Sequence, residues 1–224
     1  MESGTLLRPL TDVGGRLRRA YGFEEISLVP GATTVEPAEV DTAAEIGPIR
    51  LEIPFLAAAM DAVSDPDMAV RMHRLGGLAV VNLEGLYTRY PDARPIIEQV
   101  ADAPDALEAA RVLADAYAAP IRADLIRALI TRIKASGAAA AVATTPASAW
   151  DHAALAAEAG ADLFVVQSQV SSARHISTSG RVLSLSDLTG ALHLPVLVGN
   201  TVSGEAAYQL MEQGAAGRDR KSVV

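Results

Sequence analysis

The chain has 224 residues, of which 50% are hydrophobic, and it carries a formal net charge of -8. This size allows one substantial core, and the acidic balance without a large basic patch argues against nucleic-acid binding. The chain contains no cysteine, which excludes disulfides, thiolate metal sites and a thiol nucleophile within these residues. No apolar run approaches the roughly 20 residues of a membrane span, and a signal-peptide core is missing. We therefore predict a cytoplasmic protein without a membrane partner.

The first 48 residues are predicted to form an N-terminal arm. Residues 1–20 are polar and rich in glycine, and the chain then stays acidic and irregular up to Pro48. Ile49–Ile53 alternates apolar and polar residues, a pattern typical of a short strand with one wet face. A domain is therefore expected to begin at about residue 49.

The next stretch, Pro54–Gly85, has the pattern of a strand, a helix and a second strand. Its two apolar runs, Pro54–Met60 and Leu78–Val81, predict the strands. Between them Asp65 is a helix cap and Pro66 occupies the first helical position. A pair of glycines ends the predicted helix at about residue 75. The stretch therefore predicts a β/α unit that leads into a parallel strand.

The same alternation continues to residue 217 with short connections and no signal for an antiparallel hairpin, which predicts a parallel sheet with helices outside. Further helices are expected over Ala106–Tyr117, Ala123–Ala135, Ser148–Glu158, a short segment from Ser186, and Ser203–Gln213; further strands over Ala138–Thr144, Leu163–Val166 and Pro195–Val198. A (β/α)8 barrel and a doubly wound sheet both fit this order. Rossmann and Walker motifs are missing, and polar residues follow strand after strand, which favours the barrel.

The predicted barrel is incomplete. A standard barrel needs about 250 residues, whereas residues 49–217 hold only about five β/α units. Residues 218–224, RDRKSVV, contain four charges and cannot form an inner barrel strand. The last six of them resemble the translation of a sequencing-adapter oligonucleotide. We therefore expect a truncated fragment that ends in a non-native tail.

Several motifs, spread over about residues 16–217, resemble the IMP dehydrogenase/GMP reductase family. They are FEEISLVP at 23–30, IPFLAAAMDAV at 53–63, LGGL at 75–78, NLEGLYTRY at 82–90, GADLFVVQS at 160–168, VGNT at 198–201 and GAAG at 214–217. The fourth motif is similar to the IMP dehydrogenase-related subgroup that lacks the regulatory CBS pair. Consistently, the segment between Asn82 and Pro120 is too short to hold an inserted CBS pair.

The resemblance implies a barrel that binds a purine nucleotide, IMP, GMP or XMP, at the carboxyl ends of its strands. It implies hydride transfer between purine C2 and NAD or NADP, with a cysteine that attacks C2. The leading hypothesis is conversion of IMP to XMP, and the alternatives are GMP reductase, a non-catalytic nucleotide-sensing paralogue and an unrelated phosphate-binding barrel. The family cysteine would follow Gly217, so this chain is expected to be inactive. The resemblance also suggests a tetramer for the full-length parent.

Five residues stand at positions where the resemblance implies contact with substrate or cofactor. Ala58, Met60 and Asn200 are the predicted substrate-binding residues, although Ala58 stands where the family has serine. Gln167 and Ser168 are the predicted cofactor-binding residues. At Gln167 the dehydrogenase pattern has an aspartate that holds the nicotinamide ribose, and a neutral amide replaces that carboxylate here. Simpler interpretations exist, because methionine can fill a core and asparagine can tolerate a left-handed turn.

Other strand-end residues have structural interpretations. Asp61 could cap or brace the loop that follows its strand, and a functional role is an equal alternative. Turn chemistry explains Asn82 and Glu84. The four histidines are scattered without metal-ligand spacing, so no metal site is predicted. Candidates for a subgroup-specific surface or subunit contact are Tyr87, Arg89 and Tyr90.

Overall fold

A computed structural model describes residues 21–169, 171 and 183–218 of the chain. The chain divides into two compact units, Met1–Asp41 and Thr42–Val224. The described part of the first unit contains two short 3-10 helices, η2 (Phe23–Glu25) and η3 (Pro37–Glu39), and its side chains are largely exposed. The predicted lead-in over residues 1–20 lies outside the described residues.

The second unit begins with an antiparallel hairpin of β1 (Ala44–Ile46) and β2 (Ile49–Leu51). The prediction that no antiparallel hairpin is present is therefore wrong, and the predicted strand from residue 49 is an arm of this hairpin. Gly47 has a φ of 57° in the two-residue connection, a conformation that glycine adopts without strain. The hairpin escapes sequence analysis because each strand has only three residues and the first one, Ala-Glu-Ile, lacks a β-branched run.

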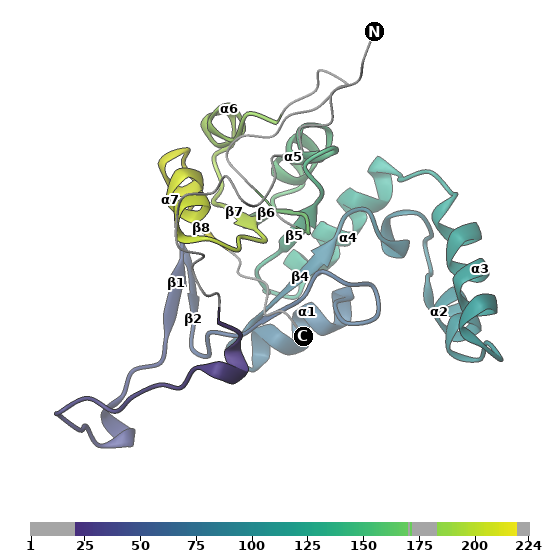
Figure 1. The fold of residues 1–224 in the computed structure, drawn as a ribbon. Coiled ribbons are helices and arrows are strands. Elements are labelled where there is room, and N and C mark those ends of the chain that lie inside the picture. The colour runs from purple at the N-terminus through teal and green to yellow at the C-terminus, as the bar shows by residue number, and fades with distance from the viewer. Residues whose placement is uncertain (1–20, 170, 172–182, 219–224) are drawn as a thin grey trace, which may run out of the picture. The chain divides into compact units, whose positions relative to one another are not determined.

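The main sheet has six parallel strands in chain order (Figure 1). They are β3 (Leu56–Ala57), β4 (Leu78–Asn82), β5 (Ala141–Thr144), β6 (Leu163–Gln167), β7 (Val196–Gly199) and β8 (Gly217–Arg218). A doubly wound sheet would reverse its strand order at a switch point, whereas this order never reverses. The fold is therefore the predicted incomplete (β/α)8 barrel.

The last strand is a correction to the sequence analysis, which placed Arg218 in a tail. Gly217 and Arg218 pair in parallel with Leu197 and Val198. Pairing at the sheet edge uses backbone groups, so the charge of the residue does not prevent it. The remainder of the predicted tail, residues 219–224, lies outside the described part of the chain.

Seven α-helices occur among the described residues: α1 (Pro66–Arg74), α2 (Arg94–Ala101), α3 (Ala106–Tyr117), α4 (Ala123–Ala135), α5 (Ala149–Glu158), α6 (Leu185–Ala191) and α7 (Gly204–Glu212). Helix α1 begins as predicted, because the Asp65 carboxylate accepts a hydrogen bond of 2.6 Å from the Met68 amide. It ends at Arg74, and Gly76, two residues further on, has a φ of 84°. The six predicted helices are all present.

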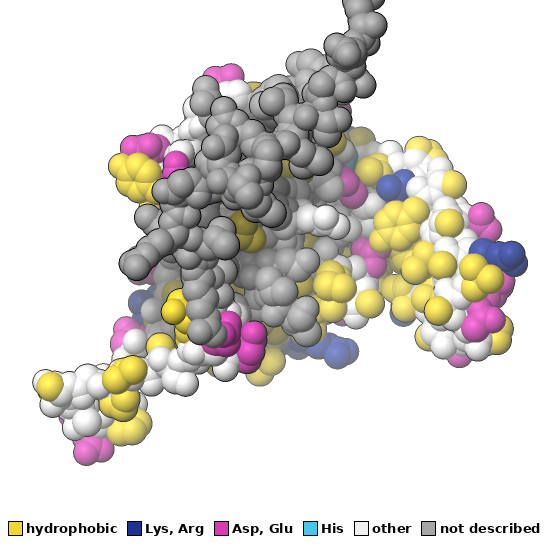
Figure 2. Space-filling view, viewed as in Figure 1, with side chains coloured by type: hydrophobic (Ala, Val, Ile, Leu, Met, Phe, Trp, Pro, Cys, Tyr) yellow, Lys and Arg dark blue, Asp and Glu magenta, His cyan; other side chains and the backbone are white. Residues whose placement is uncertain are grey.

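Helix α2 was not predicted, because its sequence reads as part of a polar stretch. It has no fully buried residue and packs as a pair with α3, beside the sheet (Figure 1). Ile96 and Ile97 contact a small cluster around Leu86, Ala93 and Ala116. In Figure 2 hydrophobic side chains gather over one side of this pair and charged side chains line its outer edge. The pair is therefore amphipathic, and packing on α3 stabilises α2.

The core has two layers, one on each face of the parallel sheet. The larger cluster joins the outer face to the helices and includes Val81, Val142 and Phe164. The smaller cluster lines the inner face and includes Leu78, Val165 and Leu51 of the hairpin. Successive strand residues alternate between the two clusters, so the face on which a strand-end side chain lies follows from its register.

Candidate functional site

The carboxyl ends of β6 and β7 bring Gln167, Ser168 and Asn200 together. Gln167 pairs in register with Gly199. The backbone amide of Ser168 donates to the Gly199 carbonyl at 2.9 Å, and the backbone amide of Asn200 donates to the Ser168 carbonyl at 3.0 Å. Two predicted cofactor-binding residues and one predicted substrate-binding residue therefore share one edge of the sheet.

Their side chains differ in exposure. Asn200 is only 5% exposed, whereas Gln167 and Ser168 are half-buried. Gln167 follows the register of Leu163 and Val165, which belong to the inner-face cluster, so its side chain is directed toward the barrel interior. The Ser168 hydroxyl lies 3.0 Å from the Ser171 hydroxyl.

The other two predicted residues follow β3. Ala58 is exposed and Met60 is 56% exposed, so Met60 is not a core residue. Strands β4 and β5 lie between β3 and β6, and the two groups of predicted residues are therefore separated along the same sheet edge. Adjacent strands are about 4.8 Å apart, so the separation is about 14 Å along a flat sheet and shorter on a curved one.

Asp61 braces the loop after β3. Its Oδ2 accepts hydrogen bonds from the Leu86 amide at 2.8 Å and from the Tyr117 hydroxyl at 2.5 Å. Burial, together with this bond to a carboxylate, raises the pKa of Tyr117 well above its usual range. We call the Asp61 carboxylate, the Leu86 amide and the Tyr117 hydroxyl the Asp61 clamp. A Cβ on Gly85 would lie 1.8 Å from Asp61 Oδ1, so only glycine leaves room for the clamp.

Arg89 and Tyr90 use their polar groups within the chain. The Arg89 guanidinium donates to the carbonyls of Glu84 and Ala119, and it lies 5.2 Å from the centroid of the Tyr117 ring. The Tyr90 hydroxyl donates to the Ala116 carbonyl at 3.1 Å. These contacts fasten the end of α3 to the loop after β4, and a role in a subunit contact stays a prediction.

Glu84 makes more than the turn contact expected of it. Asn82 forms the expected turn, because its side chain accepts a hydrogen bond from the Glu84 amide at 2.9 Å. Glu84 Oε1 itself accepts from the Thr144 hydroxyl at 2.7 Å, the Thr145 hydroxyl at 2.9 Å and the Thr145 amide at 3.0 Å. Thr144 also lies 2.9 Å from Nδ1 of His152. We call these residues, Glu84, Thr144, Thr145 and His152, the Glu84 network.

The network fixes protonation states. Burial acts to raise the pKa of Glu84, but the hydrogen bonds from Thr144 and Thr145 outweigh it and lower the pKa below its usual value. Burial lowers the pKa of His152. The single hydroxyl proton of Thr144 goes to Glu84, so neutral His152 donates its Nδ1 proton to Thr144. Glu84 is therefore an ionised carboxylate that joins the ends of β4 and β5.

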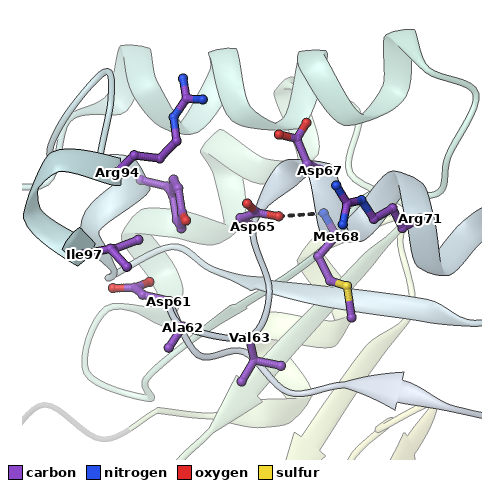
Figure 3. A pocket seen from close by; sticks show the side chains of 10 residues that line it. Asp61, Ala62, Val63, Asp65, Asp67, Met68, Arg71, Arg94 and Ile97 are labelled. Carbon is purple, nitrogen blue, oxygen red and sulfur yellow. Dashed lines mark hydrogen bonds between the residues drawn. The ribbon is translucent and has the colours of Figure 1, made fainter. Parts of the chain in front are cut away.

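A pocket of about 380 Å³ is lined in part by the loop after β3, at Asp61, Ala62 and Val63 (Figure 3). Its walls come from the loop itself, the start of α1 and α2, with Arg71 and Arg94 on opposite sides.

No group of three metal-ligating side chains occurs within the described ranges. Likewise, no helix in the described part of the chain combines the length and apolar character that crossing a membrane requires.

Sequence reasoning missed Thr144, His152 and Tyr117. Each joins a contact across at least eight residues, and the Tyr117 contact spans 56 residues. Two adjacent threonines at the end of β5 were a signal that could have been read as a polar strand end. Tyr117, at the end of a surface helix, offered no such signal.

A parallel barrel sheet with polar side chains along its carboxyl edge is the arrangement in which (β/α) barrels bind ligands. The chain belongs to the IMP dehydrogenase/GMP reductase domain family, whose model matches residues 20–218. The resemblance inferred from the motifs is thus confirmed.

Known relatives agree with this assignment. An uncharacterized oxidoreductase of Mycobacterium tuberculosis is 36% identical over 209 residues, which are 92% of this chain and 56% of that protein. An inosine-5'-monophosphate dehydrogenase of Methanocaldococcus jannaschii is 42% identical over 65 residues, which are 29% of this chain and 13% of that protein. The crystal structure of an IMP dehydrogenase/GMP reductase-like protein from Corynebacterium glutamicum superposes with a TM-score of 0.84 at 32% identity, over 92% of this chain and 55% of that one. This chain spans about half the length of the relatives that it matches over most of its residues.

Proposed function

We propose that the chain is the part of an oxidoreductase whose sheet edge binds the purine nucleotide. The reaction proposed for this oxidoreductase is the conversion of IMP to XMP with NAD. Membership of the family carries this proposal. The placement of Met60, Gln167, Ser168 and Asn200 along the carboxyl edge of one parallel sheet supports it. The parent protein is proposed to act in the cytoplasm as a homo-oligomer, for which the resemblance suggests a tetramer.

The proposed substrate contacts are Met60, Ala58 and Asn200. A half-exposed thioether is polarizable and suits the flat face of a purine. Ala58, two residues earlier, is small and leaves space beside Met60. Asn200 is buried, so we propose that it offers a single, fixed hydrogen-bonding group rather than a broad contact surface.

The proposed cofactor contacts are Gln167 and Ser168. The Gln167 amide can both donate to and accept from a ribose hydroxyl, so the residues present fit a nicotinamide nucleotide. Such a cofactor supplies the hydride chemistry when it is bound. A neutral amide binds a pair of hydroxyls less strongly than a carboxylate does. This feature weakens the case for a dehydrogenase and does not oppose GMP reductase, which converts GMP to IMP with NADPH and is the second candidate.

The 224 residues contain no cysteine, and the thiolate step of the family needs one. We therefore propose that the chain binds nucleotide without turning it over. Incubation with IMP plus NAD and with GMP plus NADPH should give no change in NADH or NADPH absorbance. Turnover of either pair would show that the reaction proceeds without a thiol.

Nucleotide binding is tested by titrating IMP, GMP, XMP, AMP and UMP into the chain labelled with 13C-methyl methionine. IMP, GMP and XMP should shift the Met60 methyl signal saturably, and replacement of Met60 by alanine should weaken binding about fivefold, the loss of roughly 1 kcal/mol of contact. Met211→Ala is the matched control, because Met211 is 53% exposed on α7.

The other possible results of the titration distinguish the alternative functions. Equal responses to all five nucleotides would favour an unrelated phosphate-binding barrel. No response to any nucleotide would defeat the proposal. Binding by this chain combined with no turnover by the full-length parent would favour the nucleotide-sensing paralogue.

A further inference from the structure

The turn that carries Met60 is not held by regular sheet pairing. Strand β3 ends at Ala57, and the Met60 carbonyl accepts the amides of Val63 and Ser64 at 2.9 and 2.8 Å. Met60 is 56% exposed, so packing does not fix its side chain either. The position of Met60 therefore depends on what ties this turn to the rest of the chain.

Asp61, the next residue, provides such a tie. Its carboxylate reaches the Leu86 amide, 25 residues away, and the Tyr117 hydroxyl, 56 residues away. Hydrogen bonds to a carboxylate are stronger than bonds between neutral groups. Both partners lie outside the turn, so these two hydrogen bonds attach the turn to the rest of the chain.

Tyr117 is itself supported. It is the last residue of α3, and the Arg89 guanidinium lies 5.2 Å from the centroid of its ring. Arg89 also donates hydrogen bonds to the carbonyls of Glu84 and Ala119. Because Arg89 holds the Tyr117 ring in place, the Tyr117 hydroxyl can fix the position of the Asp61 carboxylate.

We propose that Tyr117 is a positioning residue that, through the Asp61 carboxylate, sets the place of Met60 at the nucleotide site. The consequence for nucleotide affinity rests on the proposed function, whereas the effect on Met60 itself does not. In this arrangement α3, which lies beside the sheet, controls a residue of the sheet edge. The pair α2–α3 thus has a role in the site and is not only a connection between β4 and α4.

The test compares Tyr117→Phe with Tyr90→Phe in the chain labelled with 13C-methyl methionine. Both substitutions remove one hydroxyl that donates within the same region, since Tyr90 bonds the Ala116 carbonyl. Tyr117→Phe should shift or broaden the Met60 methyl signal, whereas Tyr90→Phe, which leaves the Tyr117 hydroxyl on Asp61, should move it less. Signals of Met68 and Met72 on α1 should stay unchanged in both variants, which separates positioning from general loosening.

The second readout is the IMP dissociation constant, which should rise about fivefold in Tyr117→Phe and by less in Tyr90→Phe. Asp61→Asn, which keeps the shape of the side chain, should reproduce the Met60 change. An unshifted Met60 signal in Tyr117→Phe, or equal shifts of all methionine signals, would overturn the proposal. If the unaltered chain binds no nucleotide, the proposed function fails, but the Met60 signals of the free variants still decide whether Tyr117 positions the turn.

Discussion

Replacing Glu84 by glutamine tests the Glu84 network. The substitution keeps the size of the side chain but removes the charge to which Thr144 and Thr145 donate three hydrogen bonds. A bond to a charged group contributes about 1 kcal/mol more than a neutral one. The three bonds share one oxygen on a half-buried side chain, so screening reduces the total, and we expect a loss of about 1–2 kcal/mol of unfolding free energy.

The loss should depend on pH. The folded state lowers the pKa of Glu84, so the unfolded chain takes up a proton there at a higher pH than the folded chain does. The stabilisation by Glu84 is therefore fully present above the unfolded value of about 4.3 and declines as the pH falls through the folded value. The difference between the unaltered chain and Glu84→Gln should be constant from pH 7 to pH 5 and shrink below that.

Urea unfolding followed by tryptophan fluorescence measures this difference. Trp150 is the only tryptophan, and it lies on α5 two residues before His152. With a slope of about 2–3 kcal/mol per M of urea, the midpoint should fall by about 0.5 M at pH 7. Glu98→Gln, on the exposed surface of α2, is the control and should leave the midpoint unchanged. An unchanged midpoint in Glu84→Gln, or a deficit that is just as large at pH 3.5, would refute the reasoning.

Three further predictions concern the cap, the core and the buried histidine. Asp65→Ala removes the acceptor of the Met68 amide and should cost about 1 kcal/mol of unfolding free energy in urea, a value that an unaltered midpoint would contradict. Leu163→Ala should cost about 2–5 kcal/mol, seen as a lower thermal midpoint, because Leu163 is fully buried on the inner face; a loss below 1 kcal/mol would argue against this packing. His152 should titrate below about pH 6.5 by NMR, since burial lowers its pKa; the stability that neutral His152 confers is then present above about pH 6.5 and lost as the pH falls toward the folded value. Titration of His152 at or above pH 6.5 would contradict its neutral, buried state.

Local signals were sufficient for much of the fold. Helix α1 could be predicted because its cap bond joins residues only three apart and its end is marked by glycines. The parallel order followed from the alternation of apolar runs with helical segments. The β1–β2 hairpin and α2 could not be predicted, because their stability comes from packing on the inner-face cluster and on α3.

The candidate site shows the same limit. Ser168 and Asn200 could be placed at one edge because each follows a strand that is evident from the sequence. The contacts of Asp61 with Tyr117 and of Glu84 with Thr144 span 56 and 60 residues, and no local pattern specifies a pairing over that distance. Tertiary packing alone creates these two networks.

The central claim is that the carboxyl edge of this sheet binds a purine nucleotide beside Met60. The most direct measurement is a titration of IMP into the 13C-methyl methionine-labelled chain, read at the Met60 signal with Met211 as the internal reference. The account predicts a saturable shift of the Met60 signal alone, which UMP does not produce. An IMP-induced shift of the Met211 signal without one at Met60, or no shift at saturating IMP, would contradict it.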